Sequence, residues 1–406
     1  MSDTVRCCVV GGGPAGMMLG FLLARAGVEV TVLEKHADFL RDFRGDTIHP
    51  STLSILDELG LLQEFLTLPH REVHELRVQL GDTVIPVGDF SHLSAPCRFI
   101  ALMPQWEFLN FLARQSARRR TFRLLMRTEA TELVRDGERV TGVRMTTPDG
   151  PRELRADVVV AADGRGSILR QQAGLEVEVF GAPMDVLWFR VSREPSDPAG
   201  IMGRFDAGQI FIALDRGDYW QCGYVIAKGS ADEINRRGLD AFRDGVASVA
   251  PFPRERANEI RDWDQVKLLT VQVDRLRRWY LPGLLCIGDA AHAMSPMGGV
   301  GINLAIQDAV AAANALAARL RAGEVRLDDL ARVQRRRELP ARATQWVQVQ
   351  LQNRIVTPVL QSAETPAPPL PLRLLARFPV LRRIPAYLVG VGVRPEHVIT
   401  PDVQAT

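Results

Sequence analysis

The stretch Leu284–Asp308, LLCIGDAAHAMSPMGGVGINLAIQD, decides how this chain of 406 residues is expected to fold. Its first residues, Leu284–Ile287, form the short apolar run that is typical of a strand buried on both faces. Gly288 ends the run, and Asp289 then places a carboxylate at the carboxyl end of the strand. This is the edge at which open α/β sheets bind their ligands.

A loop with almost no side chains follows at Pro296–Gly301, and it leads into an Ala-rich helix expected over Ile302–Arg321. Backbone N–H groups exposed by such a loop, beside the amino end of a helix, favour a negatively charged or carbonyl-rich ligand. Taken alone, the stretch also fits an ordinary strand–loop–helix crossover without a ligand. The amino-terminal end of the chain favours the ligand-binding interpretation.

That end repeats the pattern, because a strand expected at Val5–Val10 runs into GGGPAG at residues 11–16. The segment fits G-x-G-x-x-G at Gly11, Gly13 and Gly16. The first glycine makes the tight turn, the second lets the backbone approach a pyrophosphate, and the third lets helix and strand pack closely. The turn therefore predicts a site for a dinucleotide.

The next elements support this prediction. A helix is expected over Pro14–Arg25, with Gly27 at its carboxyl end, followed by a strand at Val28–Leu33. Glu34 ends that strand about 20 positions after the glycines, where an acidic residue accepts hydrogen bonds from an adenosine ribose.

Three more side chains are candidates for contact with the dinucleotide. Arg44 can reach back to a pyrophosphate as a bidentate donor, or it can be a solvated cation beside Asp46. Gln105 begins a helix, where chemistry alone favours a surface amide. Asp163 follows a buried strand expected at Ala156–Ala162 and is the second carboxylate at a strand end.

Composition excludes several other classes of protein. Hydrophobic residues at 46% and charged residues at 24% describe a globular chain, and the net charge of +2 gives no support to nucleic-acid binding. The five cysteines lack metal-ligand spacing and a disulfide pattern, which favours no metal site and a reducing cytoplasm. Glycines and a proline interrupt the apolar amino-terminal run, so we expect no signal peptide. No uninterrupted apolar segment approaches the ~20 residues of a membrane span, so we expect no transmembrane segment.

The pattern along the chain predicts an α/β fold, α+β overall. A Rossmann-like dinucleotide domain (residues 1–70, 98–180 and 281–345) is interleaved with a β-rich substrate domain (71–97 and 181–280). In the second domain we expect strands at 186–191, 209–214, 219–226 and 265–273, and one helix at 234–249. Its aromatic residues are more typical of a core than of a pocket.

The carboxyl-terminal segment, 346–406, is expected to be helical and interrupted by prolines. A long helix over 327–355 should be broken at Pro340. The Arg-rich apolar segment Leu372–Val389 fits an anionic membrane surface, but Pro379 and Pro385 break any single helix. We therefore expect it to pack against the body of the protein.

Together these motifs resemble the single-component (class A) FAD-dependent monooxygenases, the group of para-hydroxybenzoate hydroxylase and the ubiquinone-biosynthesis hydroxylases. The likeness covers roughly residues 5–345 and depends on three ordered motifs. These are Gly11-x-Gly13-x-x-Gly16 with Glu34, then Asp163-Gly164-x-x-Ser167-x-x-Arg170, then Gly288-Asp289 with Pro296.

The resemblance implies a noncovalent FAD and a role for each matching residue. Glu34 would bind the ribose, with Arg44, Gln105 and Asp289 on the pyrophosphate and ribityl chain. Asp163 would support FAD and a transient NAD(P)H, and the Gly299–Asn303 backbone would contact the isoalloxazine ring. Arg44 and Pro296 are the implied catalytic residues, and the full set of implied cofactor contacts is Gly11, Gly13, Ala15, Gly16, Glu34, Lys35, Arg44, Gln105, Ala130, Asp163, Asp289, Gly299, Val300, Gly301, Ile302 and Asn303.

The resemblance also implies an activity, the hydroxylation or other oxygenation of an aromatic or polyketide-like small molecule. NAD(P)H would reduce the flavin, and O₂ would form a C4a-hydroperoxide. A flavin-dependent reductase or dehydrogenase of the prenyl-reductase type and a non-catalytic flavin-binding protein are the alternatives. A single dinucleotide fingerprint disfavours a two-domain disulfide reductase, and the missing Trp-x-Trp-x-Ile-Pro signature disfavours a halogenase.

Overall fold

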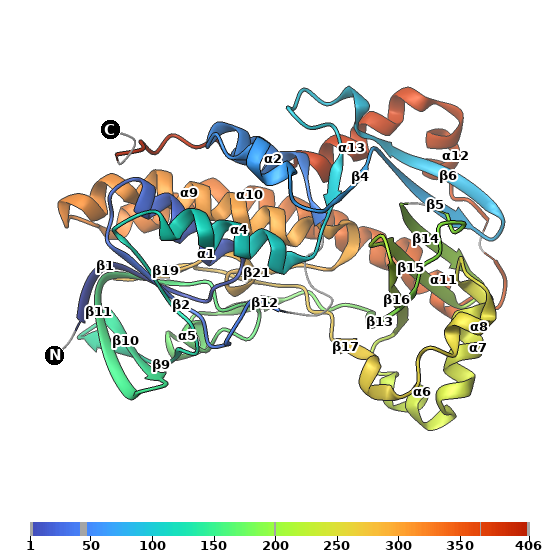
Figure 1. Cartoon of the computed structure of the whole chain (residues 1–406), viewed down its shortest axis with the longest axis horizontal. Helices are drawn as coiled ribbons and strands as arrows, with labels where there is room; N and C mark the ends of the chain where they lie inside the picture. The colour runs from blue at the N-terminus through green and yellow to red at the C-terminus, as the bar shows by residue number, and fades with distance from the viewer. Residues whose placement is uncertain (1–2, 41–46, 199, 366, 404–406) are drawn as a thin grey trace.

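Two large β-sheets with helices packed on them form the structure, a computed structural model that describes residues 3–40, 47–198, 200–365 and 367–403 (Figure 1). The first sheet is parallel in the order β8–β2–β1–β11–β20, with β19 antiparallel at the β20 edge. Its strands are β1 (Asp3–Val10), β2 (Val30–Leu33), β8 (Phe122–Leu125), β11 (Gly150–Ala161), β19 (Tyr280–Leu281) and β20 (Leu284–Cys286).

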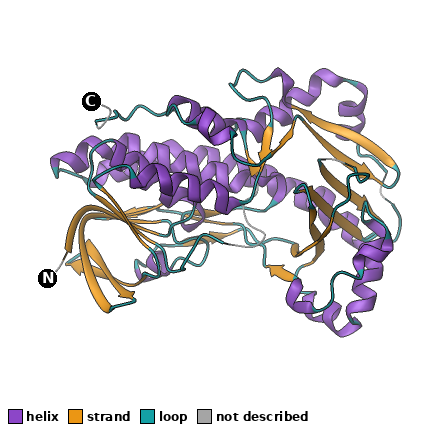
Figure 2. Ribbon diagram, viewed as in Figure 1, coloured by secondary structure: helices purple, strands orange, loops and turns teal. Residues whose placement is uncertain are grey.

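Helices cover one face of this sheet, and a β-hairpin covers the other (Figure 2). The helices are α1 (Pro14–Arg25), α4 (Gln105–Ala117), α9 (Val300–Ala322) and α10 (Leu327–Leu351), and the hairpin is β9 (Glu129–Asp136) with β10 (Arg139–Thr147), beside α5 (Ile168–Gln172). Among the described residues, only Met297–Ala322 is long and apolar enough to cross a membrane. Its most apolar window is 78% buried inside the protein, as expected for a core helix.

The second sheet has the order β17–β13–β16–β15–β14–β5–β6. Its strands are β5 (Glu75–Leu80), β6 (Thr83–Asp89), β13 (Met184–Ser192), β14 (Ile201–Asp206), β15 (Gln209–Asp215), β16 (Tyr219–Ala227) and β17 (Lys267–Leu269). The strand expected at 265–273 is thus reduced to three residues. β14 was not predicted, because Gly203 and Arg204 interrupt its apolar alternation.

Three helices pack on the outer face of the second sheet, through a core that includes Phe189, Phe211 and Phe242. They are α6 (Ala231–Arg237), α7 (Leu239–Val249) and α8 (Arg254–Ala257). The single helix expected over 234–249 is wrong, because Gly238 takes a φ of +91° and separates α6 from α7. A positive φ of this kind is accessible to glycine and ends a helix.

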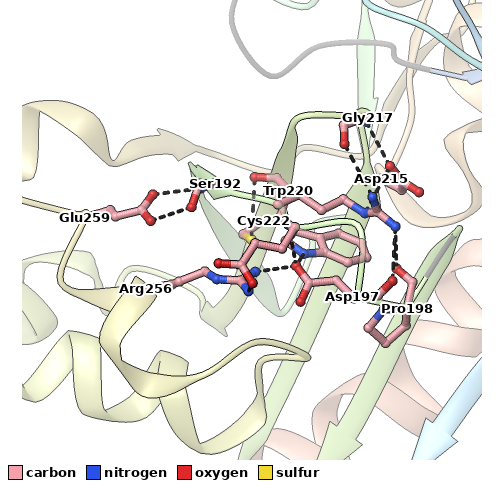
Figure 3. Close-up of polar contacts among 11 residues, drawn as sticks. Ser192, Asp197, Pro198, Asp215, Gly217, Trp220, Cys222, Arg256 and Glu259 are labelled. Carbon is pink, nitrogen blue, oxygen red and sulfur yellow. Dashed lines mark hydrogen bonds and ion pairs between the residues drawn. The ribbon is translucent and has the colours of Figure 1, made fainter.

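A buried polar cluster fastens the loop after β13 to α8 and β16 (Figure 3). The Asp197 carboxylate accepts hydrogen bonds from Arg256 and from Trp220 Nε1, the latter at 3.1 Å. Arg193 Nε lies 3.3 Å from Asp215 Oδ1. Paired in this way, the charges can be buried without the cost of an isolated ion.

Two small sheets and two helices connect the large sheets. The small sheets are β3 (Thr47–Ile48), β7 (Ile100–Leu102) and β4 (Arg71–Val73), and β12 (Val177–Val179), β18 (Asp274–Leu276) and β21 (His292–Ala293). The helices are α2 (Pro50–Glu58) and α3 (Leu62–Leu66). β3 is the segment that reaches the loop before α9.

The carboxyl-terminal part begins with α10, which continues through Pro340 without a break and corrects the prediction. Pro340 is buried with Leu330, Val333 and Ala341, so packing against the core offsets the backbone hydrogen bond that proline cannot make. A π-helical turn (Gln352–Val356), α11 (Thr357–Gln361), α12 (Leu370–Arg377), a 3₁₀ turn (Pro379–Arg382) and α13 (Arg383–Gly390) follow. Of the two prolines expected to break this segment, Pro379 follows the end of α12, whereas Pro385 lies inside the first turn of α13.

Candidate active site

The glycine-rich turn after β1 approaches its neighbours so closely that two of its glycines have no room for a side chain. At Gly11, where φ is +108°, a Cβ would lie 2.3 Å from the carbonyl oxygen of Ala162, and at Gly16 it would lie 1.9 Å from that of Gly11. Gly13 differs, because a Cβ there would meet no atom within 4 Å. Gly13 is also the N-cap of α1 and offers no side-chain acceptor, so the amino end of the helix is open to an anionic ligand.

Glu34 holds the other side of this turn. Its buried carboxylate accepts hydrogen bonds from the backbone N–H groups of Gly12, at 3.0 Å, and His36, at 2.9 Å. Lys35 follows and lies 3.9 Å from Glu129 through its Nζ atom. These contacts fix an acidic side chain at the end of β2, beside the glycine turn.

Two carboxylates lie at the carboxyl ends of neighbouring strands. β11 and β20 run parallel with Ala161 opposite Cys286, so Asp163 and Asp289 follow the same edge of the sheet. Burial raises the pKa of Asp163, and its Oδ1 atom has no hydrogen-bond partner among the described residues. Asp289 Oδ2 lies 3.3 Å from Arg165 Nη2. A buried oxygen without a partner indicates a place where a ligand donates a hydrogen bond.

The loop before α9 contains two glycines in conformations that other residues rarely adopt, and one of them has no room for a side chain. Gly298 and Gly299 take φ values of +77° and +63°, and a Cβ at Gly299 would lie 2.3 Å from Thr47 Oγ1. Thr47 Oγ1 also donates a hydrogen bond of 3.1 Å to the carbonyl oxygen of Gly299. The loop is therefore fixed in position by β3.

Asn303 in the first turn of α9 strengthens the same connection. Its Oδ1 atom accepts from His49 N at 2.9 Å and from Thr52 Oγ1 at 2.8 Å. Its Nδ2 atom donates to the carbonyl oxygens of Thr47, at 3.0 Å, and Gly299, at 3.2 Å. Because the Asn303 side chain makes four hydrogen bonds inside the protein, it orients the loop. Contacts with a ligand would then come from the backbone of the loop.

A single cavity of about 800 Å³ joins these parts. Of the residues selected from the sequence, it is lined by Gly11, Gly13, Ala15, Glu34, Lys35, Gln105, Ala130, Asp163, Asp289, Pro296, Gly299, Gly301 and Ile302. Three others, Gly16, Val300 and Asn303, are not part of that lining. Arg44 lies outside the described residues. Gln105, which chemistry alone assigned to the surface, is buried at the first turn of α4.

The far half of the cavity is almost entirely apolar. It is formed by the inner face of the second sheet, through Leu76, Val78, Val87, Met184, Val186, Trp188, Ile201, Phe205, Ile210, Ile212, Leu214 and Val225. Gly203 lies among them, and a Cβ there would have only Phe205 within 4 Å. Trp188, expected in a core by its residue type, lines this wall.

Sequence reasoning missed the residues that support the site from behind. Thr47 and His49 belong to no motif, and their partners are more than 250 positions away in the chain. Asp308 is buried beneath the turn at Gly288, where it accepts from Gly288 N at 3.0 Å, pairs with His292 at 2.6 Å and accepts from Arg337 Nε at 2.9 Å. The only feature of the sequence that could have indicated this role is that Asp308 is a carboxylate within an otherwise Ala-rich helix.

Comparison with known proteins agrees with this geometry. The family described as FAD binding domain matches residues 4–347. The 6-methylpretetramide 4-monooxygenase of Streptomyces rimosus is 33% identical over 93% of this chain and 91% of that protein. The dialkyldecalin synthase of Streptomyces rugosporus is 27% identical over 76% of this chain and 64% of that protein. PqsL, a probable FAD-dependent monooxygenase of Pseudomonas aeruginosa, has a similar structure (TM-score 0.73, 25% identity, 88% of this chain and 97% of that chain).

The chain thus belongs to the FAD-binding-domain family, within the FAD-dependent monooxygenases. The site fits the cofactor on its own evidence. The open space at Gly13, the uncapped amino end of α1 and the unpartnered oxygen of Asp163 are features that a dinucleotide with a ribityl chain would satisfy.

Proposed function

We propose that this protein is an NAD(P)H-consuming FAD monooxygenase that hydroxylates a flat, apolar aromatic compound of the polyketide type. One observation carries the proposal. The polar dinucleotide half of the cavity and its apolar half meet at the loop Pro296–Gly301. The similarity to the 6-methylpretetramide 4-monooxygenase supports the same substrate class.

Each part of the polar half has a proposed role toward FAD. Gly11, Gly13, Ala15 and Gly16 with the amino end of α1 hold the pyrophosphate, together with Arg44. Glu34 binds the adenosine ribose, while Lys35 and Ala130 border the adenine. Gln105, Asp163 and Asp289 accept or donate along the ribityl chain. The backbone of Gly299, Val300, Gly301, Ile302 and Asn303 contacts the isoalloxazine ring, with Pro296 beside the position where oxygen reacts.

When bound, FAD supplies the electron transfer from NAD(P)H and the activation of O₂. The chain supplies position and environment. N–H groups of the Gly298–Gly301 loop are fixed in advance by Thr47 and Asn303, so they can stabilise negative charge without reorganising. The apolar sheet excludes water from the reacting face.

We further propose the domain division predicted above, with residues 1–70, 98–180 and 281–345 for FAD, 71–97 and 181–280 for substrate, and 346–406 as a tail. The chain has five cysteines, all free and buried among the described residues, which suits a reducing cytoplasm.

The test is isotopic. The purified yellow protein is supplied with NADPH or NADH, ¹⁸O₂ and a panel of phenolic and polycyclic aromatic compounds. We expect slow NAD(P)H oxidation alone, faster oxidation with a suitable compound, and one ¹⁸O atom in the product. A product that is only hydrogenated or dehydrogenated would favour the reductase alternative. A rearranged product formed without NAD(P)H oxidation would favour a cofactor-bound but non-redox activity.

A further inference from the structure

The outward sides of α12 and α13 are apolar, which is unusual for surface helices. Leu370, Leu374 and Phe378 are spaced four residues apart and are 67%, 39% and 49% exposed. On α13 the spacing repeats at Ile384 and Leu388, both exposed, with Val380 between the helices. We call these six residues the tail face. A helix that packs on a protein normally turns polar residues to solvent.

The other side of α13 already packs on the body of the protein. Ala386 is buried, and a Cβ at Gly390 would lie 3.1 Å from Leu93 and 3.2 Å from Phe90. α12 and α13 lie at one corner of the molecule, beside β6 (Figure 1). Packing on the body, as the sequence predicted, therefore uses one side of α13 and leaves the tail face exposed, with Ile384 and Leu388 lining a hollow of about 610 Å³ beside α2.

The charged side chains of the tail segment itself have a single sign. The neighbouring body contributes Glu75, which lies 3.9 Å from Arg382, and Asp89 and Glu396, which line a hollow with Ile384 and Leu388. Residues 370–390 contain four arginines and no aspartate or glutamate. Arg373 and Arg377 are exposed, directly before Leu374 and Phe378, and no carboxylate of a described residue forms an ion pair with either. Arg382 is turned inward, where its Nε atom donates to the carbonyl oxygen of Leu375 at 2.9 Å and its Nη1 atom lies 3.9 Å from Glu75 Oε1. Arg383 is exposed, with its Nη2 atom 3.4 Å from His92.

We infer that the tail face docks on an anionic lipid bilayer. Apolar side chains on one side of short helices, flanked by arginines, match the boundary between lipid head groups and acyl chains. The arginines complement the negative surface of such a bilayer. A second copy of the chain is a poorer occupant, because the exposed Arg373 and Arg377 of two such faces, which have no carboxylate partner among the described residues, would repel each other.

Docking would place the apolar half of the cavity close to the bilayer. β5 and β6, which line that half through Leu76, Val78 and Val87, also support the tail helices. An apolar substrate dissolved in lipid would then have a short path to the site. The tail face is an observation independent of the proposed activity, so either can fail without the other.

The experiment is flotation of the FAD-loaded protein with vesicles. We expect binding to phosphatidylcholine vesicles containing one-third phosphatidylglycerol, on the order of 10-fold stronger than to pure phosphatidylcholine, and weakened by salt. Arg373→Glu with Arg377→Glu, and separately Ile384→Ser with Leu388→Ser, should each lower binding about 10-fold. All variants should keep their flavin and their NAD(P)H oxidation, which shows that they are folded.

Two matched controls accompany these variants. Arg236→Glu with Arg237→Glu makes the same change in charge on α6, and Leu339→Ser removes an exposed leucine from α10. Both should bind vesicles as the wild type does. Absence of binding, equal binding to both kinds of vesicle, or an equal loss in the controls would overturn the proposal. A protein that self-associates through the tail face and ignores vesicles would overturn it as well.

Discussion

His49 and Val389 are 340 positions apart in the chain, yet the Nδ1 atom of His49 donates a hydrogen bond of 2.7 Å to the carbonyl oxygen of Val389. The other ring nitrogen, Nε2, lies 3.2 Å from Thr47 Oγ1, which contacts the loop at Gly299. A buried histidine therefore links α13 to the loop expected to hold the flavin. Because burial lowers the pKa of His49 to about 4, from an ordinary value of 6.5, the ring is neutral at pH 7.

This lowered pKa predicts acid sensitivity. The unfolded protein binds a proton at His49 near pH 6.5 and the folded protein only near 4, so the contribution of neutral His49 to stability is present above 6.5 and is lost as pH falls to 4. The two values correspond to roughly 3 kcal/mol. Denaturant unfolding at a series of pH values should show a smaller loss for His49→Gln than for the wild type. The exposed His397 is the control, and an unchanged loss in His49→Gln would contradict the prediction.

Gly13→Val should separate folding from cofactor binding. Because a Cβ at Gly13 meets nothing in the protein, the variant should fold with normal stability as the apoprotein. Its side chain would occupy the space of the pyrophosphate, so FAD affinity should fall on the order of 100-fold, about 2.7 kcal/mol. Flavin titration and thermal unfolding measure the two effects. Gly16→Val, with a Cβ 1.9 Å from Gly11, should instead fail to fold, and a yellow Gly13→Val protein would place the cofactor elsewhere.

Gly203→Leu should reduce the apolar half of the cavity and leave the polar half intact. The leucine has space to enter, since only Phe205 lies within 4 Å of its Cβ position. With a polycyclic substrate we expect kcat/KM to fall about 10- to 100-fold, and FAD content to stay unchanged. Val84→Leu, on the exposed side of β6, is the matched control. Equal activity on large and small aromatic compounds would show that substrate binds elsewhere.

Asp308→Ala should be strongly destabilising. Asp308 and Arg337 are completely buried. Loss of the carboxylate removes the ion-pair partner of His292 and one of the two carboxylate partners of Arg337, the other being Glu396 at 3.3 Å. Such a break costs about 3–5 kcal/mol in the free energy of unfolding. The double variant Asp308→Leu with Arg337→Met should lose less, because the buried guanidinium is removed together with Asp308 and Glu396 keeps its ion pair with Arg336. Asp328→Ala, on the surface of α10, should cost less than about 1 kcal/mol. Equal losses for Asp308→Ala and Asp328→Ala would argue against the buried network.

The sequence was most informative where chemistry is local. Gly11, Gly16 and Gly299 appear in the sequence as glycines because each needs a close approach or a positive φ, and the strands before them are apolar runs. Asp163 and Asp289 were found as residues that follow such runs. These features are sufficient to predict the first sheet and most of its ligand edge.

Contacts between distant segments were not predictable in the same way. The bonds from Asn303 to Thr47 and from His49 to Val389 depend on how remote segments meet, and a single sequence carries no periodicity for that. The continuous helix through Pro340 was missed for a related reason, since packing against the core overrides the local preference of proline.

The link between Thr47 and Gly299 has a consequence for biosynthesis. The two residues are separated by 252 positions, so a ribosome makes β1, the glycine turn and β3 long before it makes the loop that completes the pocket. Until α9 has emerged, the nascent chain contains only the part of the binding site formed by the glycine turn and β3, and the edge of β11 that will pair with β20 is exposed. Capture of the cofactor by the complete site is therefore a late event in the synthesis of the chain.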